Sequence, residues 1–177
     1  YNFSHGDERV TILQTMAEKM NKITAKLWAA REKGLPLATI RDAVILASIV
    51  EKETSLREER AHVAGVFINR LRRGMRLQSD PTVVYGLTRG TGPLGRPLRR
   101  ADLKQDTPYN TYRLAGLPPA PISNPGRAAL HAVLHPAAGK DLYFVADGTG
   151  GHAFAATFAE HKRNVKRWRR IKAKQYK

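Results

Sequence analysis

Apolar residues recur three or four positions apart over three stretches of the chain, which is the spacing that places them on one face of a helix. The first stretch covers residues 7–31. The second begins after Thr39, which forms a capping-box pattern with Asp42, and continues to about residue 53. The third covers residues 58–73 and is followed by a glycine, a common helix terminator. We therefore expect three amphipathic helices in the N-terminal part of the chain.

The pattern changes after the third helix. Residues 75–125 are rich in Gly, Pro, Thr and Asp, which predicts loops, turns and short helices. A short helix follows at 128–134, and the β-branched and aromatic residues at 142–146 predict a strand. A glycine-rich turn leads to a possible partner strand at 151–154, and a final helix ends at about residue 172. The expected fold class is α+β, mainly α, with a small β-hairpin.

Composition restricts the class of protein. The chain has 177 residues, of which 42% are hydrophobic and 26% charged, so it can bury a core and fold. It contains no apolar run of ~18 residues, the length that a membrane-spanning helix requires. It also contains no cysteine, which excludes a disulfide framework, a cysteine zinc site and a cysteine nucleophile.

The formal net charge is +16, which favours a polyanionic partner such as nucleic acid, anionic lipid or an acidic polymer. Much of the excess lies in residues 161–177, which contain no acidic residue. A basic terminal helix that is simply solvated explains the same residues, so both interpretations stay open.

Glu53 is the leading candidate for chemistry. It lies four positions after Ile49 and eight after Ile45, so it continues an apolar stripe to the end of the second helix. We expect its carboxyl group to be partly buried, which raises its pKa and favours a proton donor near neutral pH. An ion pair with Arg57 or Arg60 would be the purely structural alternative.

Other carboxylates are weaker candidates. Glu51 lies on a different face of the same helix and is the second choice for the acid. A glycosidase with two carboxylates would need a partner about 5 to 9.5 Å away. The available residues are Asp80, Asp102, Asp106 and Asp147. A mechanism with one carboxyl group, in which a hydroxyl of the substrate is the nucleophile, is also open.

Metal and cofactor motifs are weak or absent. His131 and His135 are four positions apart, but no HExxH motif, P-loop, GxGxxG or GxSxG motif occurs. We therefore expect neither a metal nor a cofactor. Residues 108–112 combine hydroxyl, amide and aromatic groups, which suits a sugar but also an ordinary surface loop.

Four segments together resemble one known family. They are ASIVEKET at 47–54, VAGVFINRLRRGMRLQSDPTVVYGL at 63–87, YNTYRLAGLPPAPISNPG at 109–126 and LYFVADGTGGHAF at 142–154. They resemble the YceG-like, or MltG-type, endolytic murein transglycosylases of bacteria, over residues 37–165. Their length and order make the resemblance specific. Ala120 departs from the pattern, because glycine is more usual there.

The resemblance implies a lysozyme-like catalytic domain that acts on peptidoglycan. Such a lyase cleaves the β-1,4 bond between N-acetylmuramic acid and N-acetylglucosamine (MurNAc and GlcNAc) without water and leaves 1,6-anhydroMurNAc ends. One glutamic acid serves as acid and then as base, and the family motif places it at Glu53. From the resemblance and from residue chemistry, we expect further residues to bind the glycan. They are Gln78, Ser79, Asp80, Tyr85, Asn110, Thr111, Tyr112, His152 and Phe154.

The resemblance also implies a context. We expect residues 1–36 to be a helical lead-in and 37–177 the catalytic domain with a basic C-terminal helix. A single-pass anchor in the inner membrane and a LysM-like part would precede them, with the catalytic domain on the periplasmic side. The expected partners are glycan strands and the peptidoglycan synthases of elongation and division.

Three alternatives remain. A muramidase would hydrolyse the same bond with a second acid such as Asp80. A module that binds peptidoglycan without catalysis would need no proton donor. A nucleic-acid-binding module would use the basic tail, but it leaves the four motifs unexplained, so we do not expect nucleic acid as a partner.

Overall fold

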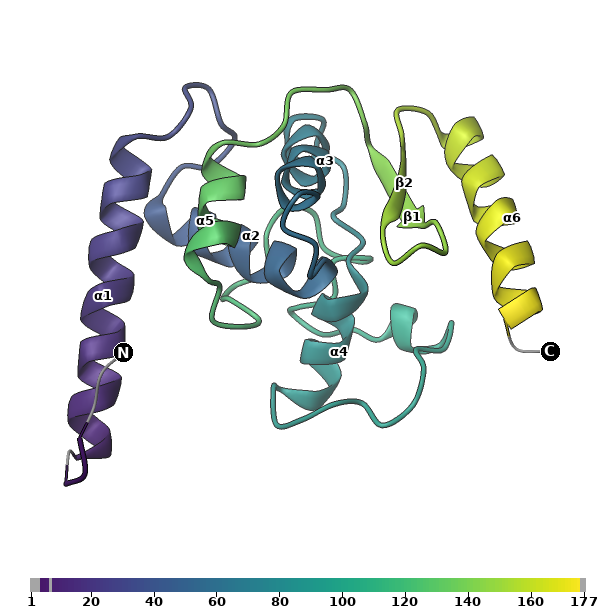
Figure 1. Ribbon diagram of the computed structural model, residues 1–177. Helices are drawn as coiled ribbons and strands as arrows, with labels where there is room; N and C mark the ends of the chain where they lie inside the picture. The colour runs from purple at the N-terminus through teal and green to yellow at the C-terminus, as the bar shows by residue number, and fades with distance from the viewer. Residues whose placement is uncertain (1–3, 7, 176–177) are drawn as a thin grey trace.

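The structure is a computed structural model that describes residues 4–6 and 8–175 (Figure 1). Residue 7, where we expected the first helix to begin, and residues 176–177 of the basic tail lie outside the described residues. The elements in chain order are α1 (Arg9–Ala29), α2 (Ile40–Glu53), α3 (Arg60–Arg72), α4 (Asp80–Thr88), the 3₁₀ helix η1 (Asp102–Lys104), α5 (Arg127–Leu134), β1 (Tyr143–Ala146), β2 (His152–Ala155) and α6 (Phe158–Gln175). The expected α+β class, mainly α, is confirmed.

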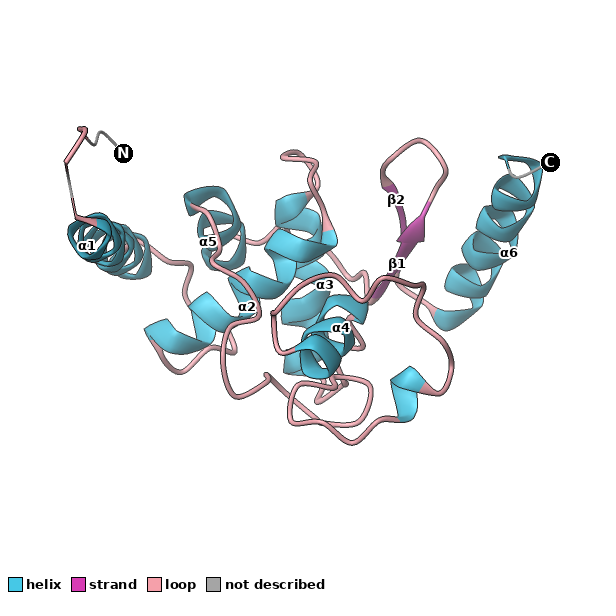
Figure 2. Cartoon of the chain, turned by 90° about the horizontal axis from the view of Figure 1, so that it is seen from below, coloured by secondary structure: helices cyan, strands magenta, loops and turns pink. Residues whose placement is uncertain are grey.

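Helix α2 lies at the centre of the core, packed against α3 and α5 (Figure 2). Every position from Ala43 to Val50 except Val44 is buried, which is why its sequence is apolar on nearly every face. The capping box that we expected begins the helix. The Asp42 N–H donates to Thr39 Oγ1 at 3.1 Å, and the Thr39 N–H donates to Asp42 Oδ2 at 2.9 Å. The helix ends at Glu53, so the core itself fixes the position of this carboxyl group.

Helix α1 departs from its expected packing. Its C-terminal half packs against α5 and α2, where Thr24 and Leu27 are buried. Its N-terminal half extends past α5, as Figure 1 shows, and Val10 and Leu13 remain 58% and 63% exposed. Helical periodicity predicted this helix correctly but could not indicate how much of it meets a partner. Whether residues 1–36 form a unit of their own stays a prediction.

The hairpin and α6 form the other end of the molecule. Strands β1 and β2 pair antiparallel, with Tyr143 opposite Ala155 and Ala146 opposite His152. Helix α6 lies along the hairpin on the side away from α3 (Figure 1). The glycine-rich turn between the strands has positive φ at Gly148 and Gly150, so it needs residues without a side chain there. This packing brings the hairpin and α6 to the end of α2.

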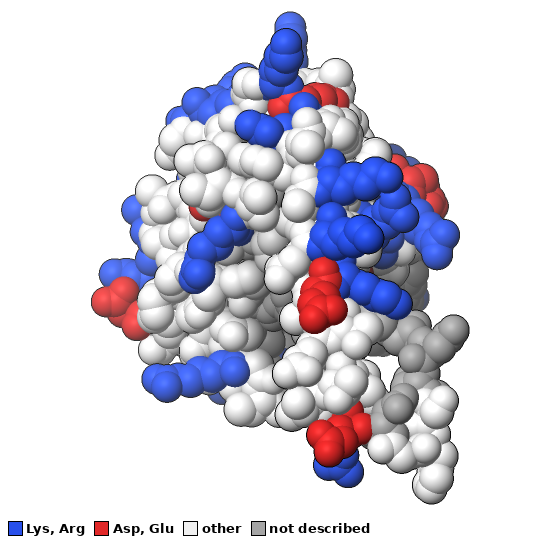
Figure 3. Space-filling model, turned by 90° about the vertical axis from the view of Figure 1, so that its left-hand side faces the viewer, with Lys and Arg blue, Asp and Glu red and all other residues white. Residues whose placement is uncertain are grey.

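Positive charge is not restricted to the tail. Figure 3 shows the face that α1 occupies, where lysine and arginine side chains spread over much of the surface among few acidic ones.

Within residues 4–6 and 8–175, no helix has both the length and the apolar character needed to cross a membrane.

Candidate active site

Two cavities meet at Glu53. The first, of about 410 Å³, lies between the end of α2, the hairpin turn and α6; Trp168 and Gly151 are among its lining residues. The second, of about 330 Å³, lies between α3, the loop before α4 and β1, and Arg70 and Asp80 line it. Glu53 lines both, so an extended ligand that occupies the two cavities passes this carboxyl group.

The Glu53 carboxyl group is a poised acid. Burial raises its pKa from 4.5 to about 7, and the charge of Asp80 acts in the same direction. The hydroxyl of Ser79 donates to Glu53 Oε1 at 2.5 Å, and this hydrogen bond, together with the positive charge of Arg70, opposes the rise. A carboxyl group with this pKa is partly protonated at neutral pH, as a proton donor must be.

Hydrogen bonds with Thr111 and Thr82 fix the backbone of Ser79. The residue is 2% exposed, and its N–H donates to Thr111 Oγ1 at 2.9 Å. Thr82 Oγ1 donates to the Ser79 carbonyl at 2.6 Å and lies 2.8 Å from Thr111 Oγ1. Gln78, the preceding residue, has φ of 51°, a backbone conformation that costs about 1 kcal/mol outside glycine. The turn is therefore strained and braced, and its position fixes the donor to Glu53.

Polar groups line the second cavity. Tyr112 donates its hydroxyl to Asp80 Oδ1 at 2.6 Å, and burial is the main cause that raises the tyrosine pKa. Arg70 is 7% exposed, and burial lowers its pKa. Its guanidinium donates to the carbonyl oxygens of Leu142 and Leu77, both at 2.6 Å. Arg70 thus links α3, the loop before α4 and β1 around the cavity.

A histidine faces Glu53 from the hairpin. His152 lines both cavities, and its Nδ1 lies 2.7 Å from Glu59 Oε2. The His152 backbone N–H also donates to Glu59 Oε1 at 2.9 Å. Trp168 of α6 adds an aromatic ring to the wall of the first cavity. The site therefore contains one acid, hydrogen-bonding groups on both sides of it and an aromatic surface, which together suit an extended sugar polymer.

Comparison with known proteins identifies the family. A model of the YceG-like family matches residues 1–167. The chain belongs to the YceG-like family. The membership predicted from the four motifs is thus confirmed.

The relatives of this YceG-like chain include two named endolytic murein transglycosylases. That of Bacillus subtilis (strain 168) is 34% identical, over 92% of the chain and 44% of the relative. That of Streptococcus pneumoniae serotype 2 (strain D39 / NCTC 7466) is also 34% identical, over 93% of the chain and 30% of the relative. The chain thus spans less than half the length of these curated relatives.

A solved structure shares the fold. The crystal structure of a YceG-like protein from Listeria monocytogenes superposes with a TM-score of 0.71 and is 34% identical in sequence. The match covers 92% of the chain and 51% of the Listeria protein.

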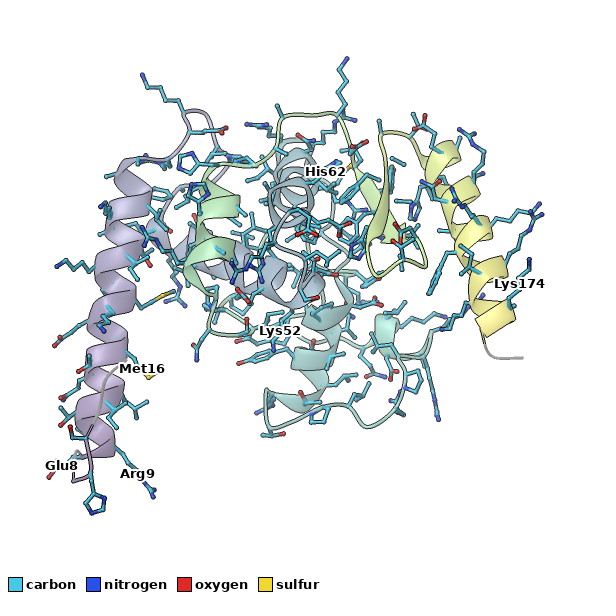
Figure 4. The ribbon with its side chains drawn as sticks, viewed as in Figure 1. Glu8, Arg9, Met16, Lys52, His62 and Lys174 are labelled. Carbon is cyan, nitrogen blue, oxygen red and sulfur yellow. The ribbon has the colours of Figure 1, made fainter. Side chains whose placement is uncertain are left out.

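Three of the residues expected at the glycan lie elsewhere in the YceG-like fold. Asn110 and Thr111 are fully buried. The Asn110 amide donates to the Gln105 carbonyl at 2.7 Å, so both residues support the loop and do not face a ligand. The Phe154 ring stacks on His62 at 3.5 Å, in the region where Figure 4 labels His62, and lines neither cavity at Glu53. Residue type suggested contact with sugar, but these three side chains do not line the two cavities at Glu53.

The other expected residues surround Glu53 or lie close to it. Gln78, Asp80, Tyr112 and His152 line the second cavity with it, and Ser79 binds it directly. Tyr85 lies in an adjacent groove of about 630 Å³, between α4 and the end of α2. Asp80 and Lys52, which Figure 4 labels at the end of α2, also line this groove. The groove continues the two cavities on the far side of Asp80.

The alternative acids have structural partners. Glu51 accepts the Gly126 N–H at 2.9 Å at the start of α5 and lies 3.8 Å from Arg60. The ion pair that we considered for Glu53 is therefore made by Glu51. Ala120, where glycine is more usual in the family, does not need a glycine conformation, because the non-glycine residues with positive φ in the described part of the chain are Gln78 and Arg89.

The remaining aspartates also have hydrogen-bond or ion-pair partners. Asp102 accepts two hydrogen bonds from the Arg96 guanidinium, which holds its pKa well below the ordinary value. Asp147 accepts from Thr149 within the hairpin turn, and Asp106 lies 3.6 Å from Arg113. Among the described residues, no group of three potential ligands could hold a metal ion. Asp80 is the one aspartate of the four that lines a cavity with Glu53.

Sequence reasoning missed Arg70, Glu59 and Trp168 as parts of the site. Arg70 lies in a helix whose charged residues look solvated, and Trp168 lies in the basic tail. The aromatic residue in an otherwise basic helix was the one available signal, since Trp168 stands on the same helical face as His161 and Val165. Glu59 carried no local signal at all.

Proposed function

We propose that the protein is an endolytic murein transglycosylase. It cleaves the β-1,4 bond between MurNAc and GlcNAc within glycan strands and leaves a 1,6-anhydroMurNAc end. The observation that carries this proposal is a single carboxyl group with a pKa of about 7 where two cavities meet. The relatives named endolytic murein transglycosylases support the substrate class.

The arrangement suits cleavage inside a strand. The two cavities and the groove beyond Asp80 provide space for sugars on both sides of Glu53. Trp168 offers an aromatic face for a sugar ring in the first cavity. An enzyme that bound only strand ends would have a binding site closed on one side of the acid, whereas cavities lie on both sides of Glu53 here.

Chemistry begins with proton donation. Protonated Glu53 gives its proton to the bridging oxygen, and the MurNAc–GlcNAc bond breaks as positive charge develops on the muramyl C1 atom. The muramyl C6 hydroxyl attacks that carbon and loses its own proton, which regenerates the acid by the end of the cycle. No water enters the product, so a single carboxyl group is sufficient for the acid role.

A muramidase is the alternative within the same site, because Asp80 lines the second cavity with Glu53. Its hydrogen bond from Tyr112 and its own exposure favour a residue that binds hydroxyl groups. The two reactions differ by one water in product mass, since hydrolysis leaves a reducing end and the lyase reaction leaves an anhydro end.

The test is mass spectrometry of purified peptidoglycan digested by the protein, by Glu53→Gln and by Glu51→Gln. We expect anhydromuramyl products from the wild type and from Glu51→Gln. Removing the acid in Glu53→Gln should lower the rate by about 100-fold or more. Products with reducing ends would replace the lyase by a muramidase, and activity retained in Glu53→Gln would move the acid elsewhere.

The cellular context is part of the proposal. We infer that the domain acts outside the cytoplasm, anchored in the inner membrane by a segment beyond this chain, and shortens or terminates strands as synthases extend them. The net charge of +16 supports attraction to anionic lipid and to the carboxylates of peptidoglycan. Localisation of the full-length protein in fractionated cells tests this context.

A further inference from the structure

The pair formed by Glu59 and His152 has no role in a cycle that uses one carboxyl group. Glu59 binds the histidine twice, through the ring Nδ1 at 2.7 Å and through the backbone N–H at 2.9 Å. Both side chains are partly buried, with 17% and 16% of their surfaces exposed. An exposed ion pair would need no such double attachment, so the contact fixes the orientation of the imidazole ring.

The fold is shaped around this contact. Glu59 directly precedes α3, and His152 is the first residue of β2, so the pair joins segments 93 positions apart. Gly151 packs against the carboxylate so closely that a Cβ atom there would meet Glu59 Oε1 at 2.6 Å. A side chain at position 151 would therefore require the Glu59 carboxylate to shift.

The second ring nitrogen is available to a ligand. Because Glu59 occupies Nδ1, Nε2 lies on the opposite edge of the ring. Among the described residues, no hydrogen bond to Nε2 is formed, and it is not a buried atom without a partner. His152 lines both cavities that meet at Glu53. A carboxylate that accepts from Nδ1 leaves Nε2 of the neutral ring as a proton acceptor, which is the arrangement of a general base.

Only one carboxyl oxygen of Glu53 is free of hydrogen bonds from the described residues, and the cycle requires two proton transfers. Ser79 already donates to Oε1 at 2.5 Å, so the acidic proton resides on Oε2. While Oε2 holds its proton for the leaving oxygen, it cannot accept a proton from the attacking hydroxyl. A separate acceptor in the same cleft allows both transfers to proceed in one step.

We propose that His152, oriented by Glu59, is a second catalytic residue that accepts the proton of the muramyl C6 hydroxyl. This inference rests on the proposed transglycosylase function. The O6–H bond breaks and its proton moves to Nε2, while the O6 electron pair forms the bond to C1. The C1–O4 bond breaks, and O4 takes the proton of Glu53. The imidazolium then returns its proton through solvent to the Glu53 carboxylate, so protons and electrons balance.

Several charged and titratable groups surround His152. Glu59 and Glu53 face it directly, and around the cavities lie Arg70 from α3, Asp80 from the start of α4, Tyr112 from its loop and His161 from α6. A base must be neutral and an acid must be protonated. The rate should therefore fall at high pH as Glu53 loses its proton.

The experiment measures the rate of anhydromuramyl product formation from pH 4 to pH 9 for the wild type, Glu59→Gln, His152→Ala and Glu58→Gln. Glu58 is exposed and adjacent, so it is the matched control. We expect Glu58→Gln to match the wild type and His152→Ala to lose about 100-fold in rate. Glu59→Gln keeps the shape of the side chain but removes the carboxylate that accepts from the His152 ring, so the rate should fall at least about tenfold.

Two further readouts separate catalysis from structure. Imidazole added to the buffer should restore part of the His152→Ala rate, which a purely structural histidine would not allow. Thermal unfolding of Glu59→Gln identifies a loss caused by misfolding. A wild-type rate in folded Glu59→Gln, or a wild-type rate in His152→Ala, would overturn the inference. A wild-type protein that forms no anhydromuramyl ends would instead overturn the proposed function.

Discussion

Replacing Glu53 by glutamine should stabilise the folded protein relative to the wild type, by an amount that grows with pH. The cause is the burial that raises the Glu53 pKa from 4.5 to about 7. In the unfolded chain, the carboxyl group ionises near its ordinary value. In the folded protein it must ionise in a site that disfavours the charge. Glutamine has the same shape and can still accept the Ser79 hydrogen bond, but it carries no charge at any pH.

The sign and size follow from linkage. Below pH 4.5 the carboxyl group is protonated in both states, so folding is not penalised. As pH rises through 4.5 and then through about 7, the wild type loses stability, because the unfolded state releases its proton first. The complete shift corresponds to about 3 kcal/mol. The stability difference between Glu53→Gln and the wild type should therefore change by about 3 kcal/mol between pH 4.5 and pH 8.5.

The assay is urea denaturation of both proteins at half-unit steps between these limits, with Glu58→Gln as the control for an exposed charge. Differences between variants cancel the pH dependence of the rest of the chain. A difference that stays constant with pH would show that Glu53 ionises at its ordinary value. The acid assignment would then lose its physical basis, even if the variant were inactive.

Three further outcomes are expected. Ser79→Ala removes the hydrogen bond that lowers the Glu53 pKa, so the alkaline limb of the rate profile should move to higher pH. Trp168→Ala should raise KM for glycan strands about tenfold, while Trp168→Phe retains most affinity because it keeps an aromatic face. Arg70→Met leaves the Leu142 and Leu77 carbonyls without their donor, so urea denaturation should show a loss of about 2 to 4 kcal/mol.

For each of these predictions, a specific result would contradict it. An alkaline limb that stays in place in Ser79→Ala would mean that the 2.5 Å contact does not affect the acid. An unchanged KM in Trp168→Ala would place the glycan outside the first cavity. Arg73→Met changes an exposed arginine at the end of the same helix, and an equal loss there would remove the special role of Arg70.

Local patterns predicted what depends on local physics. The α2 capping box and the apolar stripe that ends at Glu53 are short-range features, and both appear in the structure as expected. The same periodicity failed for the start of α1, because Val10 and Leu13 have helical spacing but no neighbouring element to cover them. Spacing predicts a helix face, but only the tertiary arrangement decides whether that face is buried.

Residue type was a poorer guide to the site than helix spacing was to the fold. Asn110 and Thr111 have the polar groups that sugars bind, yet both residues are fully buried. Asn110 donates to the Gln105 carbonyl in its own loop, and Thr111 accepts from the Ser79 N–H. Chemistry alone cannot distinguish a group that touches the ligand from one that holds its neighbour. Burial separates the two roles, and it depends on packing between segments far apart in the chain.

Glu59 shows why part of a site is invisible in a single sequence. It stands among charged residues at the start of α3, where a solvated glutamate is the ordinary interpretation. Its partner His152 lies 93 positions away, and the contact exists only because the hairpin folds back over the end of α2. The acid lies at the end of the central core helix, whereas its proposed base lies on the hairpin, where Glu59 binds it. A change that loosens the hairpin should therefore weaken catalysis while leaving the acid itself in place.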